Sequence, residues 1–213
     1  MLAKQELNTT PGTSYDYSGN GYMVAGRVAE VVMGRSFQDL LRRYLLEPLG
    51  TETATFVPTE QVRSLIPVQY DRTDQGLIPR RGEQALRSVN PGGGLVSTLD
   101  DLARFLLLHR NEGKVGGREI ISKSVLQKQY VPHPASKGTG YGLGFNILAK
   151  RADGTASRVQ HTGASGTLGL IDFDHDLILI VLTQVDQTKI GGWRTKLIQT
   201  VAEACREKKF GRK

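Results

Sequence analysis

Two short polar segments contain the residue types that could form a reactive site. The first is Tyr17-Ser18-Gly19-Asn20, directly before an amphipathic stretch, and the second is His161-Thr162-Gly163-Ala164, between two apolar stretches. Polar side chains with glycines beside them, at the edge of a strand, let the backbone of a ligand approach closely. Taken alone, each segment is more simply an ordinary turn, because the same residue types initiate loops. Their interpretation therefore depends on the elements that carry them.

Helical periodicity is found in the first 135 residues. Apolar residues from Tyr22 to Val32 recur at helical spacing, and Gly34 is expected to end this helix. Further helices are expected to start at three caps and to run from Ser36 to Leu45, from Thr98 to Leu106 and from Ser122 to about Tyr130. Residues 51–90 are predicted to be mostly loop, with a short hairpin around 68–70 and 77–79.

From residue 141 on, the spacing of apolar residues changes from that of helices to that of strands. Four stretches rich in Ile, Leu and Val and separated by short turns predict strands at 141–149, 158–161, 167–173 and 177–183. Strands at such short spacing must pair antiparallel, because parallel pairing needs a long crossover. A last helix is expected to place Ile190, Trp193, Leu197, Val201 and Cys205 on the face that packs on this sheet. Helices followed by an antiparallel sheet make the fold α+β.

Composition excludes several classes of protein. With 213 residues, 38% of them hydrophobic and 23% charged, the chain can bury a core without disulfides or a structural metal. Its longest apolar run, at 177–182, is far shorter than the roughly 20 residues of a membrane span. The lone Cys205 excludes a disulfide scaffold. Of the net charge of +7, the last eight residues carry +4, so the charge favours a basic tail over a nucleic-acid surface.

Several motifs, in order along the chain, resemble those of the serine hydrolases that include class C β-lactamases, penicillin-binding proteins and related esterases. The resemblance runs from about residue 11 to 205. Besides the two polar segments, the matching stretches are Pro11-Gly12-Thr13, Tyr22 with Gly26, Glu47–Gly50, Pro91–Thr98 leading into Asp101–Phe105, and Tyr141–Phe145. The resemblance implies a β-lactamase/transpeptidase-like fold and a β-lactamase, D-Ala-D-Ala carboxypeptidase or esterase that acts on a small-molecule or peptide acyl substrate.

The same resemblance assigns roles to both polar segments. Tyr17 matches the tyrosine of the family's Tyr-x-Asn motif, which shuttles protons together with a lysine. A phenol is a poor base at neutral pH unless nearby ammonium groups stabilise its charged form. His161 stands where the family's Lys-Thr-Gly strand has lysine, and the Ala164 backbone N–H would be an oxyanion donor. Thr162 and Gly163 would contact the substrate.

Two departures from the family pattern change what is expected of the chain. Gly19 stands where the family has Asn, so Asn20 would have to supply the side-chain amide contact to substrate. No serine in the sequence is followed by lysine three positions later, so the Ser-x-x-Lys nucleophile is missing. We therefore expect an N-terminally truncated member, inactive alone. The alternative is a non-catalytic module that binds a ligand in the same groove.

The remaining expectations concern organisation and partners. We expect one partial domain over 1–213, with a helical part at about 11–135 and the sheet and last helix at 136–213. Without the family's first strands, the sheet should have an unpaired edge and an exposed apolar face through which the chain could self-associate.

No cofactor or metal is expected, because the four histidines are widely spaced and the Asp172–Asp176 stretch reads as a polar turn. The compartment stays open: family members are often periplasmic or secreted, but the N-terminus lacks the apolar stretch of a secretory signal.

Overall fold

The computed structural model describes residues 6–80, 89–136, 140–185 and 192–207. Its centre is a four-stranded antiparallel sheet in which neighbours in sequence are neighbours in space. The strands are β5 (Asn146–Lys150), β6 (Ala156–Thr162), β7 (Leu168–Asp172) and β8 (Leu177–Val181). In the register of β6 with β7, His161 lies opposite Gly169. The prediction of an α+β fold with an antiparallel meander is confirmed.

The main core lies between the sheet and helix α5 (Leu99–Arg110). Leu106 of α5 packs with Val159 of β6 and Ile171 of β7, and all three side chains are buried. The contact is tight at Gly169, where a Cβ would lie 3.3 Å from Leu106 Cδ1. Thr98 begins this helix as predicted, since its hydroxyl accepts a hydrogen bond from the Asp101 N–H.

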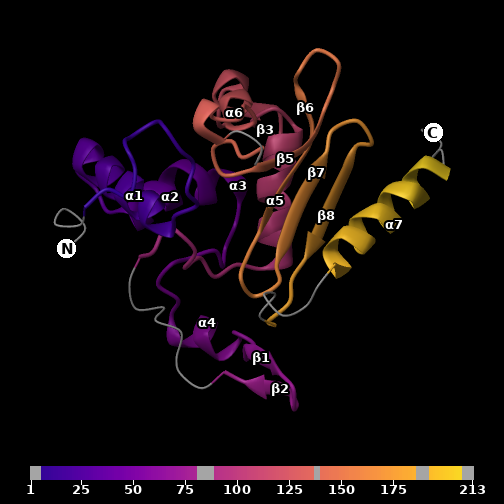
Figure 1. The fold of residues 1–213 in the computed structure, drawn as a ribbon. Helices are drawn as coiled ribbons and strands as arrows, with labels where there is room; N and C mark the ends of the chain where they lie inside the picture. Colours follow the sequence, from indigo (N-terminus) through magenta and orange to yellow (C-terminus); the bar gives the residue numbers. More distant parts are fainter. Residues whose placement is uncertain (1–5, 81–88, 137–139, 186–191, 208–213) are drawn as a thin grey trace.

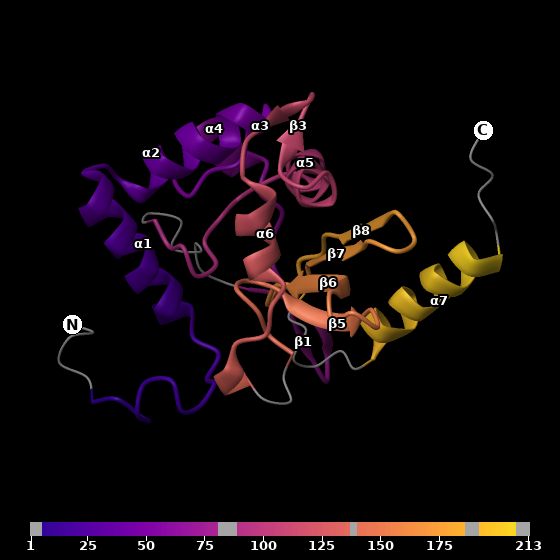
Figure 2. The same cartoon turned by 90° about the horizontal axis from the view of Figure 1, so that it is seen from above.

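Helix α7 (Trp193–Glu207) lies on the opposite side of the sheet from α5, as Figures 1 and 2 show. The alternate residues of β7, Leu168 and Leu170, are also buried, so the central strand is covered on both faces. In α7, Trp193, Leu197, Val201 and Cys205 are partly buried at the predicted helical spacing. Ile190, the first residue of that predicted stripe, lies outside the described residues.

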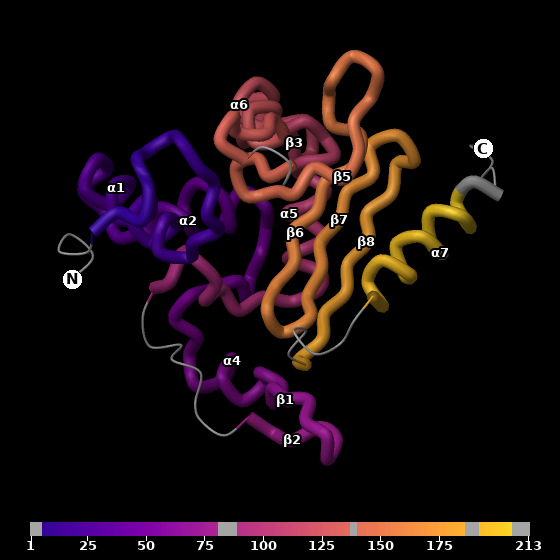
Figure 3. Tube along the Cα trace, in the orientation of Figure 1, coloured from indigo at the N-terminus to yellow at the C-terminus, as the bar shows by residue number. Residues whose placement is uncertain are grey.

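The helical part lies to the other side of α5 from the sheet (Figure 3). It contains α1 (Gly19–Met33), ended as predicted by a left-handed Gly34, and the succession α2 (Phe37–Leu41), η2 (Arg42–Leu46) and α3 (Glu47–Leu49). Ser36 caps α2 by accepting a hydrogen bond from the Asp39 N–H. The single helix predicted from Ser36 to Leu45 therefore exists, but a π-helical turn widens its second half.

Some elements differ from the sequence prediction. The strand predicted from Tyr141 begins only at Asn146, because Gly144 has a φ of +88° and the chain turns there, with the Gly142 N–H donating to the Phe145 carbonyl. The hairpin of β1 (Tyr70–Thr73) and β2 (Gly76–Pro79) is present as predicted. The short elements not predicted are α4 (Glu60–Ser64), β3 (Lys114–Val115), β4 (Arg118–Glu119) and η3 (Pro134–Ser136), while α6 (Lys123–Gln129) follows Ser122 as predicted.

Candidate functional site

Tyr17 lies two residues before the start of α1, and its side chain is 55% exposed. The glycine turn at 91–94 packs closely against this segment. A Cβ on Gly92 would lie 2.6 Å from the Gly19 carbonyl oxygen, so only glycine allows this approach. Within the described residues, the Tyr17 hydroxyl makes no hydrogen bond, so it is free to contact a bound molecule.

His161 is the penultimate residue of β6, and the chain then turns through residues 163–167 into β7. The turn is closed by a hydrogen bond from the Gly163 N–H to the Thr167 carbonyl, and a Cβ on Gly163 would collide with the Thr167 hydroxyl. From the start of α7, Arg194 Nη2 donates to the Gly163 carbonyl at 3.1 Å. No hydrogen bond between described residues uses the Ala164 N–H, and Ala164 is an exposed residue.

The structure brings Tyr17 and His161 together, although 144 residues separate them in the sequence. Their ring centroids lie 6.4 Å apart. Tyr141 packs against both rings, with centroids 5.9 Å from Tyr17 and 6.0 Å from His161. Tyr141 Oη lies 2.9 Å from His161 Nε2 and 3.2 Å from the hydroxyl of Tyr22, so a chain of hydrogen bonds runs from α1 to the sheet.

The surroundings of these rings favour uncharged side chains. Burial lowers the pKa of His161, and a backbone hydrogen bond with Thr162 only partly opposes this. Burial, followed by the neighbouring Tyr22, raises the pKa of Tyr141 well above its ordinary value. Burial also raises the pKa of Tyr15, whose ring lies 5.5 Å from that of Tyr141. At neutral pH, Tyr15 and Tyr141 are therefore neutral phenols beside a neutral imidazole.

The other residues expected at the site lie in the same two segments. Thr162 and Gly163 adjoin His161 at the end of β6, while Asn20 is exposed on the first turn of α1. The motifs in the sequence assigned no role to Tyr141 or Tyr22. The available signal was that each is an aromatic residue beside a glycine within a stretch that matches the family.

The polar stretch around Asp172 is a structural cluster, as the turn interpretation expected. The Asp172 carboxylate accepts hydrogen bonds from Arg158 Nε at 2.7 Å and from His175 Nδ1 at 2.9 Å. Burial alone would raise the pKa of Asp172, but the hydrogen bonds from His175 and Arg158 outweigh it and hold the pKa below its usual value. Over the described ranges, no group of three or more His, Cys, Asp and Glu side chains could hold a metal ion.

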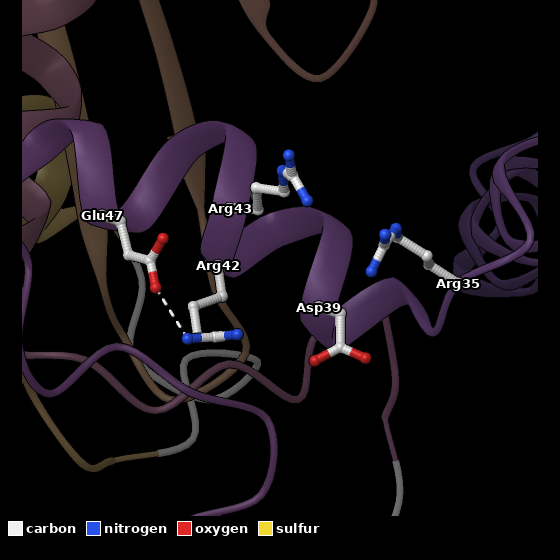
Figure 4. A pocket seen from close by; sticks show the side chains of 5 residues that line it. All are labelled: Arg35, Asp39, Arg42, Arg43 and Glu47. Atoms are coloured by element: carbon white, nitrogen blue, oxygen red, sulfur yellow. Dashed lines mark hydrogen bonds and ion pairs between the residues drawn. The ribbon is translucent and has the colours of Figure 1, made fainter.

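A surface pocket lies away from these residues, along α2 and η2 (Figure 4). Its walls are charged, and Arg42 Nη1 is paired with Glu47 Oε1 at 2.6 Å. The lining side chains are Arg35, Asp39, Arg42, Arg43 and Glu47. None of them belongs to the Tyr17–His161 cluster, and this pocket is a hollow in a solvated helix face.

Comparison with known proteins identifies the family. A family model described as Beta-lactamase matches residues 1–201, so the chain belongs to the beta-lactamase family of serine hydrolases, and the resemblance noted in the sequence is confirmed. Penicillin-binding protein 4 of Amycolatopsis lactamdurans is 30% identical over 166 residues, which are 73% of this chain and 42% of that protein. The chain spans about half the length of the curated relatives it matches.

Solved structures support the fold. EstCE1, described as a hydrolase with promiscuous acyltransferase activity, superposes with a TM-score of 0.78 at 21% identity, over 93% of this chain and 58% of its own. An octameric penicillin-binding protein homologue from Pyrococcus abyssi superposes with a TM-score of 0.66 at 23% identity, over 90% of this chain and 44% of its own. Among the described helices, none is both long and apolar enough to cross a bilayer.

Proposed function

We propose that this chain supplies the proton-transfer and oxyanion-stabilising part of the active site of a serine acyl-transfer hydrolase. The substrate would be an amide or ester, as for a β-lactamase, a D-Ala-D-Ala carboxypeptidase or an esterase. The observation that carries the proposal is the 6.4 Å approach of the Tyr17 and His161 rings from segments distant in sequence. Proton transfer requires such groups within hydrogen-bond reach of the reacting atoms, directly or through one water.

In this proposal Tyr17 is the proton shuttle. Its exposed hydroxyl, free of protein partners among the described residues, can accept the proton of an attacking serine and pass it to the leaving group. A neighbouring ammonium group from a Ser-x-x-Lys segment would stabilise its phenolate, since opposite charges favour the ionised form. Asn20, on the first turn of α1, would contact the substrate beside Tyr17.

The turn after β6 would bind the reacting carbonyl. Ala164 is exposed and its N–H makes no hydrogen bond to the described residues, as an oxyanion donor requires. Removing one such donor typically costs about 3 kcal/mol of transition-state stabilisation. Thr162 and Gly163 would align the substrate along the strand edge. His161 would contribute as a neutral hydrogen-bonding group, since burial lowers its pKa.

The nucleophile would come from a polypeptide segment that the printed sequence does not contain, because no serine here precedes a lysine by three positions. Without that lysine a serine hydroxyl is a weak nucleophile. The chain alone would then be inactive in acyl transfer. With a Ser-x-x-Lys segment in place, the tyrosine and the oxyanion turn would complete the site.

Intact-mass spectrometry tests this function. The chain as printed, incubated with a penicillin or a nitrophenyl ester, should gain no acyl group. The chain fused to an N-terminal segment that carries a Ser-x-x-Lys motif, shown by circular dichroism to be folded, should gain one acyl group on the serine of that motif. Replacing this serine with alanine is the control, and Tyr17→Phe in the fusion should slow acylation about 100-fold or more.

Two results would overturn the proposal. An adduct on Ser18 or Ser165 of the chain alone would show that the nucleophile lies within the printed sequence. A folded fusion that binds the penicillin reversibly, with no adduct, would favour the non-catalytic binding module.

A further inference from the structure

In the hydrogen-bond chain Tyr22–Tyr141–His161, the strengths of the donors and acceptors favour one direction. Each phenol has one O–H to donate, and a neutral imidazole has one nitrogen that donates and one that accepts. If Tyr141 accepts from one of these two neighbours and donates to the other, two arrangements satisfy the distances of 3.2 Å and 2.9 Å. Either protons point from Tyr22 to Tyr141 to His161 Nε2, or His161 Nε2–H points to Tyr141 and Tyr141 to Tyr22.

The first arrangement places the stronger donor against the stronger acceptor. A phenol, with a pKa near 10, is a better donor than a neutral imidazole N–H, and an imidazole nitrogen is a far better acceptor than a phenol oxygen. Tyr141 keeps its proton at neutral pH because burial raises its pKa. It can therefore donate to Nε2 while accepting from Tyr22.

We infer that Tyr141, supported by Tyr22, is a positioning residue that holds His161 as a neutral imidazole with its proton on Nδ1. The role given to this arrangement rests on the proposed function. The proton position itself can be tested without it. Protonation of Nε2 would require Tyr141 to turn its O–H away, so His161 resists the positive charge that a lysine carries at this place in the family. Proton transfer is then left to Tyr17, and His161 serves to shape the strand edge.

The groups that face His161 from the neighbouring elements are consistent with this. The phenols of Tyr17 and Tyr141 contact the ring directly, Tyr15 and Tyr22 contact it through Tyr141, Asp16 lies beside Tyr15, and Arg194 from α7 reaches the Gly163 carbonyl. The β7 residue opposite His161 is Gly169, which brings no charge. Burial lowers the pKa of His161, and the hydrogen bond with the Thr162 backbone partly opposes this.

The test is nitrogen-15 NMR of the histidine rings in the full chain, which distinguishes a protonated from an unprotonated ring nitrogen. His161→Gln assigns the signals, and the exposed His133 serves as the internal reference. In the unaltered chain, His161 should carry its proton on Nδ1 near neutral pH and titrate below the ordinary range of histidine. Tyr141→Phe should move the proton largely to Nε2 and raise the protonation constant about tenfold. Tyr22→Phe should keep the tautomer and cause a smaller change.

Two outcomes would overturn the inference: an Nε2–H tautomer in the unaltered chain, or Tyr141→Phe leaving both tautomer and titration unchanged. The tautomer of His161 is measured in the unaltered chain, so the inference can be refuted even if the Tyr141→Phe protein folds poorly. None of these readouts requires a nucleophile or an acyl adduct. Failure of the acyl-transfer proposal and failure of this one are therefore told apart.

Discussion

The two segments that meet at Tyr17 and His161 are held in very different ways. Strand β6 lies within the sheet, where Val159 is fully buried and β7 is covered on both faces. Helix α1 buries only Gly26 and leaves several apolar side chains exposed. These are Met23, Val24, Val28, Val31, Val32 and Met33. One half of the candidate site thus belongs to a packed core, and the other half to a helix attached through a few close contacts.

The difference teaches where the site is sensitive. Damage to the sheet should unfold the protein, whereas damage to the α1 contacts should displace Tyr17 and leave the sheet folded. The main α1 contacts are Gly26 against Pro91 and Phe37, and Tyr22 against Tyr141. Variants on each side can separate these two effects.

The largest effect is expected in the core. Leu106→Ala should lower the free energy of unfolding by about 3 kcal/mol, because it leaves a cavity between α5 and the sheet. Urea denaturation measures this. Leu107→Ala, on the same helix but 46% exposed, is the matched control and should cost less than about 1 kcal/mol. Equal losses at both positions would mean that the core is not packed against α5 as described.

The second largest effect should be a loss of stability at acidic pH, caused by His109 in the core. Burial lowers the pKa of His109 to about 4, against about 6.5 in an unfolded chain. Between these values the unfolded chain binds more protons, so stability falls with falling pH, by roughly 2 kcal/mol from pH 7 to pH 5. Urea denaturation at several pH values measures the slope, to which His161 contributes with the same sign.

A pair of variants isolates His109. His109→Gln should remove most of this slope and also lower stability at pH 7, since the ring hydrogen-bonds to Tyr130. The same replacement at the exposed His133 should keep the slope. An unchanged slope in His109→Gln would contradict the assignment.

A smaller effect is expected at the docking contact of α1. Gly26→Ala would place a Cβ 2.7 Å from Pro91 Cγ, and we expect a net loss of about 1–2 kcal/mol together with altered His161 NMR signals. Gly21→Ala lies on the same helix with nothing within 4 Å of its Cβ. It should instead stabilise the protein by up to about 1 kcal/mol through helix propensity. If both alanines behave alike, the contact with Pro91 does not position α1.

The smallest effect on stability, with a large effect on assembly, should come from the outer face of α1. We propose that the chain self-associates through its exposed apolar surface. Val28→Lys with Val32→Lys, at positions 56% and 75% exposed, should lower the apparent mass in sedimentation while changing stability by less than about 0.5 kcal/mol. Val125→Lys on α6 is the control. An unaltered chain that sediments as a monomer would refute the proposal.

Much of the fold was predictable because local signals determine it. Ser36 and Thr98 cap their helices with the expected hydrogen bonds, and the apolar stretches after residue 155 form the predicted strands. The strand predicted from Tyr141 was wrong at its start because the left-handed Gly144 outweighs the apolar pattern. The π-helical turn at Arg42–Leu46 has no simple sequence signature, so it was not predicted.

The site was predictable only in part. The resemblance pointed to Tyr17 and His161, and the structure places their rings in proximity, while their chemical roles stay predictions. The link through Tyr141 could not be read from the sequence. It depends on the turn at residues 142–145 and on the docking of α1, and both are long-range consequences of packing.

The hydrogen bond between Tyr22 and Tyr141 joins the loosely packed helix to the ring of a histidine in the sheet. Any tilt of α1 that lengthens this bond should change the electron density at His161 Nε2, 20 residues away from Tyr141 in the chain. The imidazole chemical shift therefore measures how fully α1 is seated, without a ligand or an assay of turnover. Screening added peptides or small molecules against that one signal would detect whatever stabilises the helix in its docked position.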